Sequence, residues 1–131
     1  MARPAARFPT EFELQILKIL WKNGTCTVRD IREALTNEGR HLAHTTVVTM
    51  LHTMTDKELV DRVRVDGKSY NFSARVSEQS VSTGMLDDLL KRVFDGSAAG
   101  LVLNLLDSEH VDEDEHRELR RLINRRRKES S

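Results

Sequence analysis

Residues 42–74 read LAHTTVVTMLHTMTDKELVDRVRVDGKSYNFSA. In the first part, apolar side chains recur at positions 47, 50, 51 and 54, a spacing that places them on one buried helix face. After Leu59 the apolar period changes from about 3.6 residues to 2, on both sides of Asp66-Gly67, a dipeptide typical of tight hairpin turns. The pattern predicts one helix followed by a two-stranded hairpin.

Two further helices are predicted before this stretch. Thr10 and Glu13 have the spacing of a capping box, and Asn23-Gly24 is a typical helix end. Thr27, with Asp30 three residues later, predicts the start of a second helix. Three short helices followed by a hairpin are typical of a winged helix-turn-helix, a DNA-binding head.

The outer face of the third helix carries small side chains that allow close approach to a surface. Threonine offers a hydroxyl to base edges and a methyl group to thymine, and this face has no Arg or Lys for a guanine, so we expect a site rich in A·T. A solvated helix is the alternative, but threonine is a poor helix former. Lys57 is expected to add charge nearby. The candidate DNA contacts are Thr27, Arg29, Thr45, Thr46, Val48, Thr49, His52, Thr53, Arg62, Arg64 and Lys68.

Beyond Val76 the apolar period is helical again and predicts three more helices. Residues 101–106 are apolar nearly all round, so that helix needs partners on several sides. Self-association would supply them and would suit a palindromic DNA site; packing onto the head is the alternative. We therefore expect a DNA-binding domain in residues 1–76 and a dimerisation domain in residues 77–131. The candidate dimer residues are Met85, Leu86, Leu89, Val93, Leu101, Val102, Leu105, Leu119 and Leu122.

The composition bounds the function. The chain has 21 basic residues (Lys and Arg) and 21 acidic residues (Asp and Glu). The charges are unevenly distributed, because residues 1–76 hold 12 basic and 9 acidic side chains, whereas residues 77–131 hold 9 basic and 12 acidic ones. Cys26 is the only cysteine, so no intramolecular disulfide can form, and we expect it to be buried. No signal peptide or membrane span is recognisable, which predicts a cytoplasmic protein with no membrane insertion.

Other functional classes have weaker support. No phosphate loop, nucleophile arrangement or paired carboxylates argue for an enzyme, and no cofactor is expected. His110 and His116 flank acidic residues that could serve a metal sensor, but the pattern is typical of an acidic helix start, so we expect no metal site. A winged helix used only for protein contacts is a further alternative.

An ordered set of residues that is typical of one known protein family extends over nearly the whole chain, from Thr10 to about Arg125. They comprise Trp21, Thr45-Thr46-Val47, Thr49, Lys57, Leu59-Val60, the hairpin at 67–72, Val93-Phe94-Asp95-Gly96, Leu101-Val102-Leu103-Asn104 and Glu118-Leu119. In this ordered set the chain resembles the penicillinase and methicillin-resistance repressors, the BlaI/MecI family.

The resemblance implies a mainly α fold, with a winged helix-turn-helix head and a C-terminal three-helix region that forms a homodimer. It implies repression at palindromic operators with a TACA/TGTA core, upstream of a β-lactamase or resistance operon. In that family a membrane sensor triggers cleavage at an Asn-Phe bond, which corresponds to Asn104-Leu105. Leu105 replaces that Phe, Thr53 a common Arg and Glu58 a common Gly. The alternative is a metal- or effector-responsive winged-helix regulator without a proteolytic switch.

Overall fold

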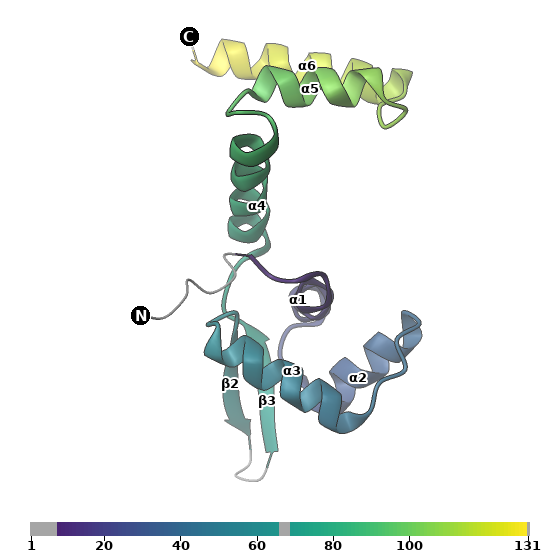
Figure 1. Ribbon diagram of the computed structural model, residues 1–131, viewed down its shortest axis with the longest axis vertical. Helices are drawn as coiled ribbons and strands as arrows, with labels where there is room; N and C mark the ends of the chain where they lie inside the picture. The colour runs from purple at the N-terminus through teal and green to yellow at the C-terminus, as the bar shows by residue number, and fades with distance from the viewer. Residues whose placement is uncertain (1–7, 66–68, 131) are drawn as a thin grey trace. The chain divides into compact units, whose positions relative to one another are not determined.

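The computed structural model describes residues 8–65 and 69–130. The described residues form α1 (Glu11–Asn23), β1 (Cys26–Thr27), α2 (Val28–Asn37), α3 (His44–Asp56), β2 (Val60–Val65), β3 (Ser69–Ala74), α4 (Glu78–Val93), α5 (Ala98–Asp107) and α6 (Glu113–Ser130) (Figure 1). The expected mainly α fold with a small wing is confirmed. The predicted turn at Asp66-Gly67 lies outside the described residues.

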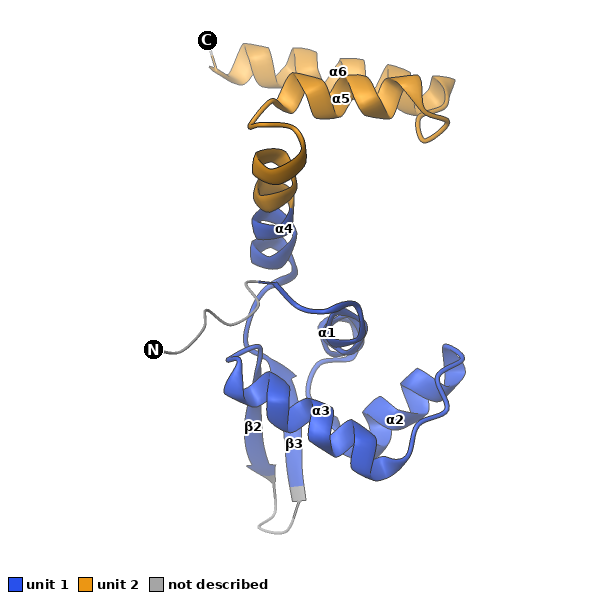
Figure 2. Ribbon diagram, in the orientation of Figure 1, with its two compact units in different colours: residues 1–85 blue, residues 86–131 orange. Residues whose placement is uncertain are grey.

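The chain divides into two compact units, residues 1–85 and 86–131 (Figure 2). This division falls inside α4, whereas the domain boundary expected after Val76 falls between β3 and α4. The first unit contains all of the sheet and the first three helices. We describe each unit by itself.

Local capping signals define the first two helices as predicted. The Thr10 hydroxyl accepts from the Glu13 backbone N–H at 3.2 Å, and the Glu13 carboxylate accepts from the Thr10 N–H at 2.9 Å. Thr27 and Asp30 form the same reciprocal pair at the start of α2. Each pair satisfies amide groups that a helix N-terminus leaves without partners.

The sheet is antiparallel with the order β1-β3-β2. Its two-residue strand β1 was not predicted, and it pairs Cys26 with Phe72 and Thr27 with Asn71. The longer pair sets Val60 opposite Ala74, and Arg64 opposite Tyr70. The sheet thus ties the segment between α1 and α2 to the wing, which is the hairpin of β2 and β3.

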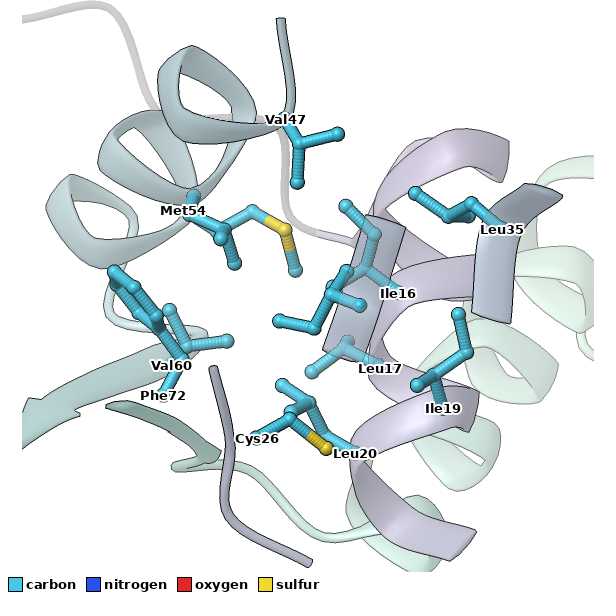
Figure 3. Packing of buried hydrophobic residues seen from close by; sticks show 12 residues of the cluster. Ile16, Leu17, Ile19, Leu20, Cys26, Leu35, Val47, Met54, Val60 and Phe72 are labelled. Atoms are coloured by element: carbon cyan, nitrogen blue, oxygen red, sulfur yellow. The ribbon is translucent and has the colours of Figure 1, made fainter. Parts of the chain in front are cut away.

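The core of the first unit lies between α1, α2, α3 and the sheet (Figure 3). Ile16 and Leu17 of α1 are fully buried, and so are Val47, Leu51 and Met54 of α3, as predicted. Cys26 is buried as expected. Burial and the nearby Asp30 carboxylate raise the pKa of its thiol, because both disfavour the thiolate.

The second unit leaves many of its large apolar side chains exposed to solvent. No residue of α5 or α6 is buried, including the candidate dimer residues Leu119 and Leu122 and their neighbour Ile123. Leu122 is half-buried, and the other two are exposed. Within a single copy of the chain, no layer of this unit covers this apolar stripe. No described helix is both long enough and apolar enough to span a membrane.

Candidate nucleic-acid interface

The helix α3 presents a polar face of small side chains to solvent. Its inner face anchors it to the core, and Met50 is half-buried at the margin. On the outer face Val48 is half-buried, so it is less available than predicted. The exposed side chains of this face are Thr45, Thr46, Thr49, His52 and Thr53. The structure thus brings together the threonine group that the helical period predicted.

The start of α3 is held by a contact from α2. Arg32 Nε donates to the Leu42 carbonyl at 2.8 Å and fixes the loop before Ala43, the N-cap residue. No side chain hydrogen-bonds at this cap, so the first amides of α3 lack a side-chain acceptor. A cavity of about 900 Å³ lies beside this end, with Arg29 and His44 among its lining residues.

Two predicted contacts at the start of α2 have structural roles as well. The Thr27 side chain is half-buried, and its hydroxyl accepts from the Asp30 N–H at 3.0 Å. Arg29 is exposed and pairs with Glu33 one turn later at 3.3 Å, a surface pair that solvent screens strongly. Arg29 is thus a better placed candidate than Thr27.

The wing carries two exposed arginines on one face. The Cζ atoms of Arg62 and Arg64 lie 4.3 Å and 5.4 Å from the centroid of the Tyr70 ring. Tyr70 was not among the predicted site residues, although its strand alternation with Phe72 was visible in the sequence. Lys68, another predicted contact, lies outside the described residues.

Lys57 does not supply free charge to this surface, contrary to expectation. Its ammonium donates to both carboxylate oxygens of Glu13, at 2.9 Å and 3.1 Å. Glu13 is only 1% exposed, so the pair belongs to the interior. The next residue, Glu58, has a φ of 62° and turns the chain from α3 into β2.

The apolar faces of α5 and α6 line a second cavity. It has a volume of about 380 Å³ and an almost wholly apolar wall. Val102, Leu105 and Leu119 line it, together with His116 and Ile123. Of the other predicted dimer residues, Met85, Leu86, Leu89 and Val93 on α4 are exposed, whereas Leu101 is half-buried.

The residues proposed for a metal sensor are not assembled into a ligand set. Among residues 8–65 and 69–130, no three His, Cys, Asp or Glu side chains form a group that could hold a metal ion. His110 instead shares a hydrogen bond of 2.6 Å between its Nδ1 and Ser108 Oγ.

In the first unit, α1, α2 and α3 combine with a three-stranded sheet, and the outer face of α3 is exposed beside a basic wing. This arrangement defines a winged-helix regulator of the DNA-binding class. A family model described as "Penicillinase repressor" matches residues 9–125. The chain belongs to the penicillinase repressor family, whose members are DNA-binding transcriptional repressors, and the resemblance inferred from the sequence is confirmed.

Several named proteins are similar over most of their length. The methicillin resistance regulatory protein MecI of Mammaliicoccus sciuri is 25% identical over 87% of this chain and 91% of that protein. The transcriptional regulator BlaI of Mycobacterium tuberculosis is 30% identical over 86% and 80%, respectively. The penicillinase repressor of Bacillus licheniformis is 21% identical over 87% and 88%.

The fold itself also recurs in solved structures. One described as "The complex structure of hsRosR-S4" matches with a TM-score of 0.53 and 16% identity, over 95% of both chains. At this identity the likeness shows the fold alone.

Proposed function

We propose that this chain represses transcription as a homodimer on a palindromic duplex operator. In each copy, α3 enters the major groove and the wing contacts the backbone. The observation that carries this proposal is the outer face of α3, where Thr45, Thr46 and Thr49 are exposed on a helix anchored from behind by a fully buried face. Such a face can approach base edges closely, and its threonines suit A·T pairs.

The dimer is proposed from the second unit. Large apolar side chains on α4, α5 and α6 are exposed in the single chain, and exposed apolar patches often mark interaction surfaces. A second copy would cover it, and a two-fold dimer matches a palindrome. In this proposal residues 1–76 bind DNA and residues 77–131 dimerise.

The names of the relatives suggest the regulated genes. MecI is named for methicillin resistance and the Bacillus licheniformis protein for penicillinase. We propose an operator with a TACA/TGTA core in front of a β-lactamase or resistance operon. Induction would follow a membrane sensor-protease pathway that leads to cleavage between Asn104 and Leu105. The wall of the α5–α6 cavity offers an apolar small-molecule effector as the alternative inducer.

The test is a selection of duplexes from a random library by the full-length protein, followed by titration of the selected duplex. We expect the selected sites to be A·T-rich inverted repeats. We also expect binding of the whole palindrome to exceed that of a single half-site by about 10²-fold or more, because the second contact is nearly intramolecular. Failure to bind any duplex at low salt would favour a winged helix that serves protein contacts.

A further inference from the structure

Tyr70 lies on the same face of the wing as two arginines, and both guanidiniums contact its ring. Arg64 is directly opposite Tyr70 in the strand pair, and Arg62 is two residues earlier on β2, opposite Phe72. The Cζ-to-centroid distances of 4.3 Å and 5.4 Å are within the range of cation–π contacts. We call Arg62, Arg64 and Tyr70 the wing stack.

The ring contacts the faces of the two guanidiniums, and no described side chain forms an ion pair with either of them. Within the part of the chain that the structure describes, no carboxylate lies within ion-pair distance of Arg62 or Arg64. The nearest acidic strand residue, Asp61, is instead within 3.9 Å of Arg75. Two exposed arginines on one face, stacked on a ring and without an acidic partner among residues 8–65 and 69–130, form an anion-binding arrangement.

Tyr70 contributes little to the hydrophobic core. It is 38% exposed and is not part of the buried cluster, whereas Phe72, two residues later, is 3% exposed and belongs to the core. An exposed aromatic ring beneath two arginines that have no acidic partner in the described part of the wing therefore has its clearest use in ordering them. A free arginine side chain loses rotamer entropy when it is immobilised, and stacking on a ring lowers the part that is lost on binding.

We infer that Tyr70 is a positioning residue for DNA binding, which holds Arg62 and Arg64 ready for two phosphates of the duplex backbone. This inference rests on the proposed function and adds to it a residue that acts through the two arginines. Phosphate contacts carry no direct sequence information, so the wing stack contributes affinity to every duplex alike. The number of released counterions is set by the arginines and not by the ring.

The experiment measures binding of the full-length protein to two fluorescent duplexes, the selected palindrome and an unrelated duplex of equal length, over a series of NaCl concentrations. Tyr70→Leu and Tyr70→Thr remove the ring, Tyr70→Phe keeps it, and Val63→Ala is the matched control. Val63 is 43% exposed and lies on β2 between the two arginines in sequence, so its side chain points to the opposite face of the hairpin.

We expect Tyr70→Leu and Tyr70→Thr to weaken binding of both duplexes about three- to tenfold while the slope of log K against log salt stays unchanged. Tyr70→Phe and Val63→Ala should remain within about twofold of the parent. Arg64→Gln should reduce the slope by about one. In the Arg62→Gln/Arg64→Gln background, loss of the ring should have no further effect.

Three results would overturn the inference while the proposed function stands. They are parental affinity in both ring-less variants, a changed preference between the two duplexes, and an equal loss when the arginines are already absent. The last result would mean that the ring acts through the fold, which thermal melting of each variant measures independently. If the unsubstituted protein binds neither duplex, the proposed function and this inference fail together.

Discussion

Lys57 Nζ lies 2.9 Å from Glu13 Oε2 and 3.1 Å from Glu13 Oε1. This pair links the C-cap of α3 to the first turn of α1, across 44 positions of sequence. The same Glu13 carboxylate accepts the Thr10 backbone N–H, so its oxygens are well satisfied although it is almost wholly buried. The pair therefore fixes the end of α3 against α1.

Replacing Lys57 with Met should destabilise the first unit. The substitution keeps most of the aliphatic stem but leaves the Glu13 carboxylate buried without its cation. Breaking a buried pair costs about 3–5 kcal/mol, and we expect roughly 2–3 kcal/mol here because the Lys57 side chain is 24% exposed. Urea denaturation measures the change.

Lys18→Met is the matched control, since Lys18 is exposed on the same helix as Glu13 and forms no ion pair with any residue of 8–65 or 69–130. Its free energy of unfolding should change by less than about 0.5 kcal/mol. Equal effects of the two substitutions would mean that the Glu13–Lys57 contact adds nothing to stability.

Local signals in the sequence predicted the helix starts. The capping pairs at Thr10 and Thr27 each act over three residues, so the sequence contains all that is needed to recognise them. The Glu13–Lys57 contact joins residues distant in sequence, and no local pattern indicates it. The strand β1 has two residues and no periodicity, and it exists because β3 offers it a partner.

Sequence periodicity also predicted part of the candidate site, but not the contacts that depend on strand pairing. The period of 3.6 residues gave the outer face of α3 correctly, except that Val48 is half-buried. Alternation placed Arg62 and Arg64 on one strand face, but only the pairing register brings Tyr70 beneath them. On α5 and α6 the apolar stripe was visible, yet a sequence of one chain does not specify what covers a stripe.

Replacing Thr46 or Thr49 with Ala should reduce discrimination between the selected operator and a mutated operator. Each side chain is exposed on the outer face of α3, and the loss of one base contact should reduce the free-energy difference between the two sites by roughly 1–3 kcal/mol. Competition titrations with both duplexes give the specificity ratio. The face assignment is wrong if both variants keep the parental ratio while Arg64→Ala alters it.

Replacing Leu119 with Glu should dissociate the proposed dimer. Leu119 is 37% exposed in the single chain and lines the apolar cavity between α5 and α6, where a charge cannot be covered by a second copy without a large desolvation cost. Sedimentation velocity should show a monomer at micromolar concentration. Binding of the palindrome should fall by about 10²-fold, with half-site binding unchanged.

Gln79→Glu is the control for this charge change, because Gln79 is exposed on α4 and does not line the cavity. It should remain dimeric. A full-length parent that sediments as a monomer at micromolar concentration would exclude the dimer altogether.

Asn104 is the polar residue within the apolar run of α5, and it is exposed in the single chain. One explanation is structural, since a lone Asn in a dimer interface can fix the register at some cost in stability. The other is the proposed cleavage of the Asn104-Leu105 bond. The Asn104 carbonyl accepts from the Ser108 N–H at 3.2 Å at the end of the helix, so α5 must open locally before a protease can cut.

We expect a β-lactam given to producing cells to yield a fragment that ends at Asn104. Mass spectrometry of the repressor recovered from these cells, without protease digestion, would detect it. This cut would remove Leu105 and all of α6, and with them most of the wall of the α5–α6 cavity. The dimer would then weaken and release the operator. Asn104→Ala, which keeps the helix, should block both the fragment and the induction. If repression is lifted while the chain stays intact, Asn104 has only its structural role and an effector or a falling protein level ends repression.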